Sequence, residues 1–194
     1  MKRITMRDVA ELADVSKATV SHVMNGTRFV EGATKERVQQ AIKELGYRPN
    51  VAARSLTTQQ SKIIGYIVSD VTNTFFGDIM RGIEDVLIAN NYSIMVCNTN
   101  EVLEREEYYI DILLKQGVDG IIAAATSQNW GALNEASKLN IPIVLLDRTF
   151  DNASFPYVGV NNTQGAYIGT KHLIECGYKD IGILSGFHRL STMR

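Results

Sequence analysis

The segment from Thr5 to Asn25, TMRDVAELADVSKATVSHVMN, constrains the fold of this chain more than any other. Its apolar residues recur at helical spacing on both sides of Asp14 and Val15, which predicts two short helices, at about 6–13 and 17–24, joined by a tight turn. Ser16 is a favourable N-cap for the second helix. Two such helices are typical of a helix-turn-helix, whose second helix can enter the major groove of DNA.

The side chains of these two helices divide into an inner and an outer set. The inner set is apolar, is expected to share one core, and contains Val9, Leu12, Ala13, Val20, Val23 and Met24. The outer set of the second helix is small, cationic or hydrogen-bonding, and contains Lys17, Ala18, Ser21, His22 and Asn25. Groups of this kind can read base edges. The alternative is an amphipathic helix pair whose polar face is merely solvated.

A third helix and a fourth, shorter one are expected to follow. Thr34 can cap a helix whose apolar residues fall at spacings of three, four and seven, namely Val38, Ala41, Ile42 and Leu45. Pro49 ends that helix, and Asn50 can cap a turn or two of helix over 51–56. So short a helix is unstable alone, so we expect it to order only against a partner.

Charge is distributed unevenly along the chain. Residues 1–60 contain ten Lys and Arg against six Asp and Glu, whereas residues 61–194 contain ten against fifteen. The near-neutral whole, with a net charge of −1, therefore conceals a basic head and an acidic body. Positive charge on the head is what contacts to DNA phosphates require.

The remainder of the chain alternates between apolar strands and amphipathic helices. Strands are expected at about 63–68, 92–97, 119–124, 143–146, 157–160 and 181–184, and helices at about 76–90, 104–116, 130–139 and 163–176. This alternation predicts an α/β fold with a doubly wound parallel sheet, in which ligands bind outside the carboxyl ends of the strands.

Enzymatic chemistry finds little support in the sequence. There is no glycine-rich dinucleotide or phosphate loop and no G-x-S-x-G element, and the three histidines (His22, His172 and His188) lack metal-ligand spacing. We therefore expect no catalytic residues, no metal and no cofactor. Glu106 and Glu107 are interpreted as surface carboxylates, and Cys97 and Cys176 as small packed residues rather than reactive ones; two cysteines do not make a disulfide framework.

The sequence also bears on the cellular location of the protein. The charged N-terminus lacks the apolar core of an export signal, and no apolar run is long enough to span a bilayer. The expected location is the cytoplasm, in association with the nucleoid and not with a membrane. A secreted sugar-binding protein would share the sheet topology, but it would carry a signal and lack the head.

Three segments together give the chain a specific resemblance. DVAELADVSKATVSHVMNG, GYRPNVAARSL and the series of βα units are similar to the lactose-repressor/galactose-repressor family of bacterial transcription regulators, over all 194 residues. Asp14 departs from the glycine common in the family's turn, but Asp tolerates left-handed backbone. The resemblance implies a helix-turn-helix domain (1–47), a hinge helix and linker (48–61), a first effector-binding subdomain (62–161) and the start of a second (162–194).

The head's contacts to DNA divide into two kinds. Lys17, Ala18 and His22 are expected to face base edges. Short polar side chains are expected to contact phosphates, and these are Thr5, Ser16, Thr19, Ser21 and Asn25. For Thr19 and Ser21, simple helix filling is the alternative.

By resemblance, the hinge helix enters the minor groove beside that of a partner subunit, on a palindromic operator bound by a homodimer or, in some relatives, a tetramer. Leu56 would wedge into the central base step, and Asn50, Ala53 and Arg54 would line the groove. The alternative is that Leu56 packs against the sheet domain. The helix at 76–90 is the best candidate for part of the dimer surface.

The effector site is expected where two strand ends share one crevice. Asn73, Phe75 and Phe76 follow the first strand, and Asp147 and Arg148 follow the fourth. The arrangement resembles ribose-type sugar-binding domains, which implies a sugar-like effector that stacks on the aromatic rings. A nucleobase or another small metabolite is the alternative effector. Phe75 or Phe76 could instead cap the core, and Asp147 with Arg148 could be a surface pair.

The last residues bear on the second wall of that crevice. Ser191 and Thr192 match a family position that often reaches the ligand. Because the sequence stops where the family pattern would continue, we expect the second subdomain to be incomplete. A 194-residue form is then expected to keep a folded head, to bind the operator weakly, to show no response to effector and to aggregate readily.

Overall fold

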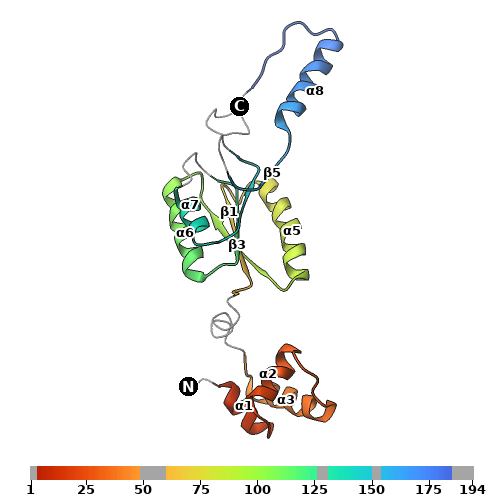
Figure 1. Cartoon of the computed structure of the whole chain (residues 1–194). Coiled ribbons are helices and arrows are strands. Elements are labelled where there is room, and N and C mark those ends of the chain that lie inside the picture. Colours follow the sequence, from red (N-terminus) through yellow and green to blue (C-terminus); the bar gives the residue numbers. More distant parts are fainter. Residues whose placement is uncertain (1–3, 49–59, 126–130, 150–153, 185–194) are drawn as a thin grey trace. The chain divides into compact units, whose positions relative to one another are not determined.

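A computed structural model describes residues 4–48, 60–125, 131–149 and 154–184 of the chain. It divides into two compact units, Met1–Gln59 and Gln60–Arg194. Within the described residues, the first unit contains three helices, and the second contains a parallel sheet with helices on both faces (Figure 1). In the described part of the chain, no helix has the length and apolar character needed to cross a membrane.

The head, as far as residues 4–48 show it, is made of α1 (Met6–Leu12), α2 (Lys17–Asn25) and α3 (Gly32–Leu45). Each helix contributes to a small core, whose buried members are Val9, Ala10, Ala13, Val20, Val38 and Ala41. Val23, Met24, Ile42 and Leu45 pack around them. The prediction that Leu12 belongs to this core is wrong: its side chain is 47% exposed, and Ala10 takes the inner position.

Local capping sets where the head's helices begin and end. Thr5 and Asp8 form a reciprocal capping box at the start of α1, and Ser16 caps α2 as predicted. Asp14 has a φ of 51°, so it adopts the left-handed turn that its side chain tolerates. The prediction that Thr34 caps α3 is wrong, because that helix already begins at Gly32 and its N-cap residue, Glu31, makes no side-chain capping bond.

The second unit is built on five parallel strands: β1 (Ile63–Val68), β2 (Ser93–Asn98), β3 (Gly120–Ala123), β4 (Ile143–Leu146) and β5 (Tyr157–Val158). Their order across the sheet is β2-β1-β3-β4-β5. The doubly wound sheet predicted from the sequence is therefore confirmed. Since the order reverses between β1 and β3, the carboxyl ends of these strands form the point at which such sheets bind ligands.

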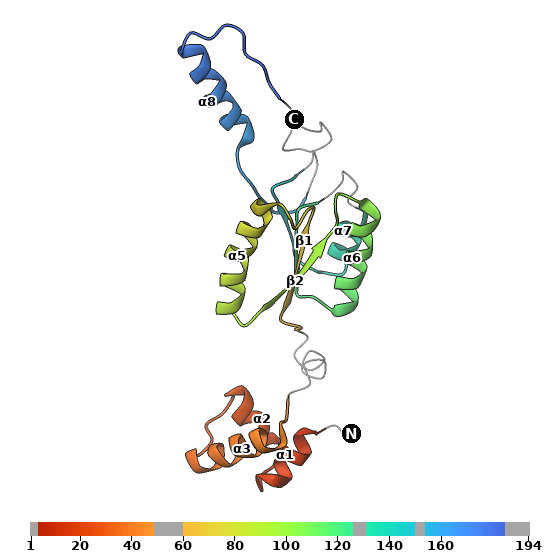
Figure 2. The ribbon, with the colours of Figure 1, turned by 180° about the vertical axis from the view of Figure 1, so that it is seen from behind.

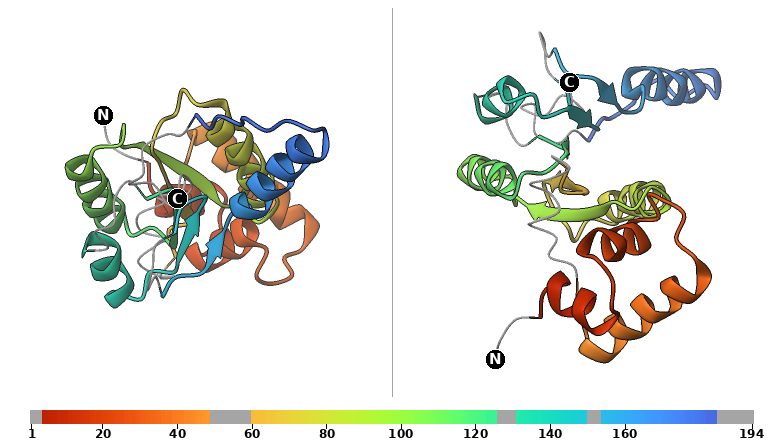
Figure 3. Two further views of the ribbon diagram at one scale, coloured as in Figure 1. Left: turned by 90° about the horizontal axis from the view of Figure 1, so that it is seen from above. Right: turned by 60° about the horizontal axis from the view of Figure 1, so that its bottom comes forward.

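Three helices cover the two faces of this sheet. Helix α5 (Thr74–Ala89) lies on one face, and α6 (Leu103–Gln116) and α7 (Gly131–Lys138) lie on the other (Figures 1 and 2). The view along the strands in Figure 3 shows the same separation. Tyr66 and Val68 of β1 contribute to the core under α5, and Ile67 to the larger core under α6 and α7. Burial on both faces explains why β1 is apolar throughout.

A glycine in β1 leaves room for a side chain of α6. A Cβ atom at Gly65 would lie 2.6 Å from Cδ1 of Leu113, a side chain that is fully buried. Helix and sheet are thus packed directly against each other at this position.

The last described helix is α8 (Asn162–Glu175), which Asn161 caps through a bond from the backbone N–H of Gln164. None of its residues is buried. The strand predicted at 181–184 does not form. In the described residues this segment pairs with no other strand, and Ile183 and Leu184 remain exposed.

Candidate functional sites

The first candidate site is the outer face of α2. The Ser16 hydroxyl accepts a bond of 3.1 Å from the backbone N–H of Thr19, and the helix then opens with Lys17 and Ala18, both exposed. Because Ser16 caps α2, it fixes the direction in which this helix leaves the loop between α1 and α2. The head thus presents a cationic side chain and a methyl group side by side at a helix start.

Further along α2, internal hydrogen bonds restrain the polar side chains. Nδ1 of His22 lies 2.8 Å from the hydroxyl of Thr27, and the Asn25 amide donates to the backbone oxygen of Ser21 at 3.0 Å and to its hydroxyl at 3.2 Å. His22 is thereby held in one orientation through one ring nitrogen. Thr27 is a partner that the sequence did not indicate.

At the other end of the head, Thr5 uses its side chain within the capping box. Its hydroxyl donates to a carboxylate oxygen of Asp8 at 2.6 Å, and its backbone N–H donates to the same oxygen at 2.7 Å. The exposed Thr5 is therefore fixed in place at the N-terminus of α1.

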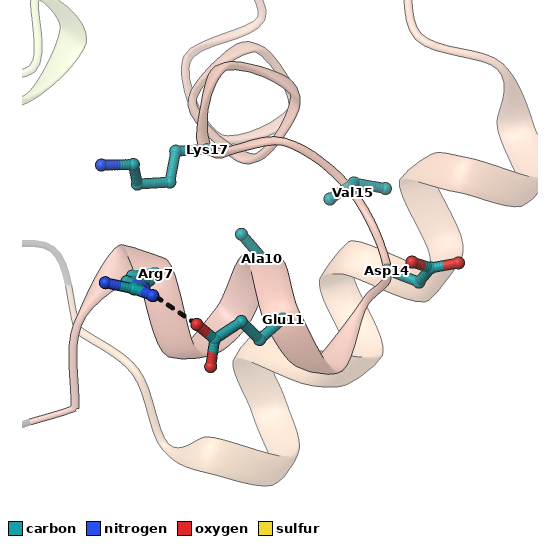
Figure 4. A pocket seen from close by; sticks show the side chains of 6 residues that line it. All are labelled: Arg7, Ala10, Glu11, Asp14, Val15 and Lys17. Carbon is teal, nitrogen blue, oxygen red and sulfur yellow. Dashed lines mark hydrogen bonds and ion pairs between the residues drawn. The ribbon is translucent and has the colours of Figure 1, made fainter.

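An open hollow of about 620 Å³ lies between α1 and the start of α2 (Figure 4). Arg7 and Lys17 lie on its two walls, and Arg7 forms an exposed ion pair of 2.8 Å with Glu11. Helical spacing in the first predicted helix is the sequence signal that places Arg7 on the outer face. The lining of the hollow thus contains two cations, Arg7 and Lys17, together with two carboxylates, Glu11 and Asp14.

Several predicted contacts lie outside the described residues. These are Asn50, Ala53, Arg54 and Leu56 of the hinge, and Ser191 and Thr192 near the end of the sequence.

The second candidate site is the edge of the sheet formed by the carboxyl ends of the strands. After β1, the Asn73 side chain caps α5 by accepting a bond of 3.0 Å from the backbone N–H of Phe75. The ring of Phe75 is 42% exposed and lies edge-on to that of Phe76, with centroids 5.1 Å apart. Phe76 itself is buried in the core under α5. Phe75 is thus the accessible aromatic ring in the first turn of α5.

After β4, Asp147 and Arg148 are enclosed, so the alternative that they form a surface pair is wrong. Arg148 is only 6% exposed, and its two terminal nitrogens donate to the two carboxylate oxygens of Glu101 at 2.7 and 2.9 Å. The backbone oxygen of Ala125, after β3, lies 3.4 Å from Nη1 of Arg148. Loops that follow β2, β3 and β4 therefore meet at one guanidinium.

Burial dominates the electrostatics of this edge. It raises the pKa of the Asp147 carboxyl, and the neighbouring Arg148 guanidinium opposes that rise. Burial and the charge of Asp147 raise the pKa of Tyr66 to about 12, and the same two causes raise the pKa of Tyr157. Both phenols act as donors, Tyr66 to the backbone oxygen of Phe76 at 3.1 Å and Tyr157 to that of Asp147 at 3.0 Å.

The loop after β2 was not predicted to take part. The Asn98 side chain accepts from the backbone N–H of Val71 at 3.2 Å and donates to the Asn100 side chain at 2.6 Å. Asn100 and Glu101 both have left-handed backbone, with φ of 51° and 59°. The only available signal was a polar run, NTNE, directly after an expected strand.

Two interpretations of reactive residue types need correction. Glu106 is not a surface carboxylate: it is 2% exposed and has an interaction partner. Cys97 is buried, which raises the pKa of its thiol to about 11, whereas Cys176 is exposed rather than packed. The described ranges contain no group of three or more His, Cys, Asp or Glu side chains able to hold a metal ion.

Comparison with known families yields two matches that follow one another along the chain. Residues 5–50 match the bacterial regulatory proteins of the lacI family. Residues 61–193 match the family of periplasmic binding proteins and sugar binding domains of the LacI family.

Individual relatives support both matches. The HTH-type transcriptional repressor PurR of Aliivibrio salmonicida is 38% identical over 183 residues, which cover 94% of this chain and 55% of the relative. The ribose operon repressor of Halalkalibacterium halodurans is 41% identical over 182 residues, which cover 94% of this chain and 54% of the relative. The chain thus spans about half the length of the curated relatives it matches.

Among solved structures, the lac repressor dimer bound to operator and the anti-inducer ONPF is similar to the chain, with a TM-score of 0.82 and 30% identity. The match covers 95% of this chain and 56% of that one.

Proposed function

The chain belongs to the lacI family of bacterial regulatory proteins, and we propose that it acts in a transcription repressor that binds operator DNA through α2 and responds to a small molecule at the sheet edge. The observation that carries this proposal is the start of α2. There Ser16 caps a helix that presents Lys17 and Ala18 to solvent, on a head with an excess of Lys and Arg. No catalytic role is proposed, since both matching families are named for regulation or binding.

The residues of the head take different roles in this proposal. Lys17 and His22 donate to guanine acceptors, and the Ala18 methyl contacts a thymine methyl. Ser16, Thr19 and Ser21 bind phosphates, and Thr5 does so once its hydroxyl is released from the Asp8 carboxylate, while Asn25, whose amide is bonded to Ser21, holds that hydroxyl in position.

The hinge supplies the second contact to DNA. Leu56 wedges into the minor groove at the centre of a palindromic operator, with Asn50, Ala53 and Arg54 beside it. Leu56→Ser should then leave the head folded but weaken operator binding and remove the bend, as measured by circular-permutation gel mobility. A bend of unchanged angle would contradict this role.

The effector proposed for the sheet edge is sugar-like, with a nucleobase or other small metabolite as the alternative. An exposed aromatic ring at Phe75 can stack on a ring-shaped ligand, the Asp147 carboxylate supplies an acceptor for hydroxyl groups, and Nε of Arg148 supplies a donor. Asn73 and Phe76 support the wall of the site that the sheet edge forms. Thr192 would belong to the opposite wall, in the second subdomain. A relative named for a ribose operon supports the sugar, and one named PurR keeps the alternative open.

Binding to a palindrome implies a homodimer, or a tetramer built from dimers. Helix α5 supports this part of the proposal, because Val86 and Ile88 are apolar and 63% and 65% exposed. We propose that α5 forms part of the dimer surface and that the protein works in the cytoplasm, at the nucleoid.

Selection from a pool of random double-stranded DNA tests the function. The chain should enrich a sequence with two-fold symmetry. His22→Ala should relax the preference at one position of each half-site, whereas Ser21→Ala should weaken binding to matched and mismatched sites by the same factor. Failure of the wild type to enrich any sequence would contradict the function, and equal effects of both variants on matched and mismatched sites would contradict the roles.

A further inference from the structure

The Arg148 guanidinium is committed to a protein partner at the sheet edge. Its two terminal nitrogens donate to both carboxylate oxygens of Glu101, at 2.9 Å from Nη1 and 2.7 Å from Nη2. Arg148 is almost fully buried, whereas the Glu101 side chain is about one-third exposed. The fork that arginine normally offers to a phosphate or carboxylate is therefore already used.

The third nitrogen of Arg148 differs from the other two. Nε is buried and has no hydrogen-bond partner among the residues that the structure describes. A carboxylate oxygen of Asp147 lies 3.9 Å from it, beyond hydrogen-bonding distance. A buried donor without an acceptor is costly, so a ligand oxygen that reached Nε would remove that cost.

The loop that holds Glu101 is strained and braced. Two successive non-glycine residues, Asn100 and Glu101, adopt left-handed backbone, which L-residues normally avoid. Asn98 fixes the loop, since its side chain is bonded both to Asn100 and to the backbone of Val71. Strain that persists because neighbouring groups over-determine it is typical of functional sites. Here its result is the placement of one carboxylate against Arg148.

We propose that Glu101 is a positioning and selectivity residue of the effector site, which makes the sheet edge accept uncharged polyhydroxy ligands and reject anionic ones such as sugar phosphates. This proposal rests on the proposed function of the edge as an effector site. The charge of Glu101 balances that of Arg148, and a carboxylate oxygen of Asp147 lies 3.9 Å from Nε of the same guanidinium. An anion would meet no surplus positive charge, while a hydroxyl oxygen could still accept from Nε.

Titrations of the 194-residue chain with ribose, ribose 5-phosphate and inorganic phosphate, followed by calorimetry and by NMR of the Arg148 Nε–H group, test the proposal. Glu101→Gln keeps the shape of the side chain and removes its charge. It should increase the affinity for inorganic phosphate by about tenfold or more, equivalent to about 1.4 kcal/mol. Glu104→Gln is the matched control, because it removes an exposed carboxylate from the first turn of α6. It should change that affinity by less than about twofold, as expected for an exposed charge.

Each outcome decides the proposal. No gain in a folded Glu101→Gln variant, or an equal gain in Glu104→Gln, would overturn it. If Glu101→Gln does not fold, the wild type decides: millimolar phosphate should leave the Arg148 Nε–H resonance unmoved, and a saturable shift would overturn the proposal. The phosphate titrations do not depend on operator binding. Failure of the DNA selection would therefore leave the role of Glu101 intact, and failure of the titrations would leave the proposed DNA binding intact.

Discussion

The head and the sheet edge place polar side chains in opposite ways. On α2, neighbouring residues of one helix provide the candidate DNA contacts, and the core beneath them consists of six small or medium-sized residues. At the sheet edge, Asn73, Glu101 and Arg148 come from three separate loops, and the core beneath is much larger. A local surface can be specified by helical periodicity, whereas an assembled one depends on the packing of the whole domain.

The largest effect should come from the core of the sheet domain. Leu113→Ala removes a fully buried side chain that packs against Gly65, and should cost about 2–5 kcal/mol. Hydrogen exchange resolved by residue should show the loss in residues 60–125 and not in residues 4–48. Leu139→Ala, at a side chain that is 63% exposed, is the control. Equal destabilisation of both units would contradict their separation.

A smaller loss is expected in the core of the head. Val20→Ala removes two methyl groups from a fully buried position and should lower the free energy of unfolding by about 2 kcal/mol. In a small unit with little stability to spare, this loss should unfold a measurable fraction of the head and weaken DNA binding in proportion. Leu12→Ala should have little effect, because that side chain is 47% exposed. If the Leu12 variant were the more damaging of the two, the assignment of the core would be wrong.

The sequence predicts features that depend on neighbouring residues, and it does not predict those that distant residues assemble. The capping of α2 by Ser16 and the span of β1 depend on neighbours in the sequence, and both were predicted correctly. The pairing of Glu101 with Arg148 joins residues 47 positions apart, so no local pattern contains it. The left-handed backbone at Asn100 and Glu101 was equally hidden, because no glycine marks it.

The errors within the head have a physical cause as well. Leu12 lies at the end of α1, where the next residue is already the C-cap, so helical spacing no longer decides which side chain faces inward. Thr34 could have capped a helix, but α3 begins two residues earlier.

The two capping predictions can be separated by a matched pair of variants. Ser16→Ala removes the bond to the Thr19 backbone and should destabilise the head by about 1 kcal/mol. Thr34→Ala lies within α3 and should change stability by no more than about 0.5 kcal/mol. Urea denaturation followed by a signal from the head measures both. A larger loss for Thr34→Ala would mean that α3 begins at the residue predicted from the sequence.

The smallest effect concerns the start of β1 and depends on pH. Burial alone would raise the pKa of Asp119, but hydrogen bonds from Ser61 (2.7 and 3.0 Å) and from the Lys62 backbone (3.2 Å) outweigh it and hold that pKa below its usual value. Its contribution to stability is therefore present above the unfolded-state pKa, near 4, and is lost as pH falls through the folded-state pKa.

Asp119→Asn should accordingly destabilise the sheet domain at neutral pH, and the difference from wild type should shrink in acid. Chemical denaturation at a series of pH values measures this difference. Asp111→Asn, which removes an exposed carboxylate paired with Lys115, is the control and should alter stability only slightly. A difference between Asp119→Asn and wild type that grew on acidification would contradict the assignment.

Mapping of backbone amide shifts during titration with operator-type duplex DNA can show whether the head alone contacts DNA. We expect the shifts to concentrate at Thr5 and over 16–25, and residues 60–125 and 131–149 to stay unchanged. Shifts concentrated at the sheet edge, or on α3 with none on α2, would contradict this expectation.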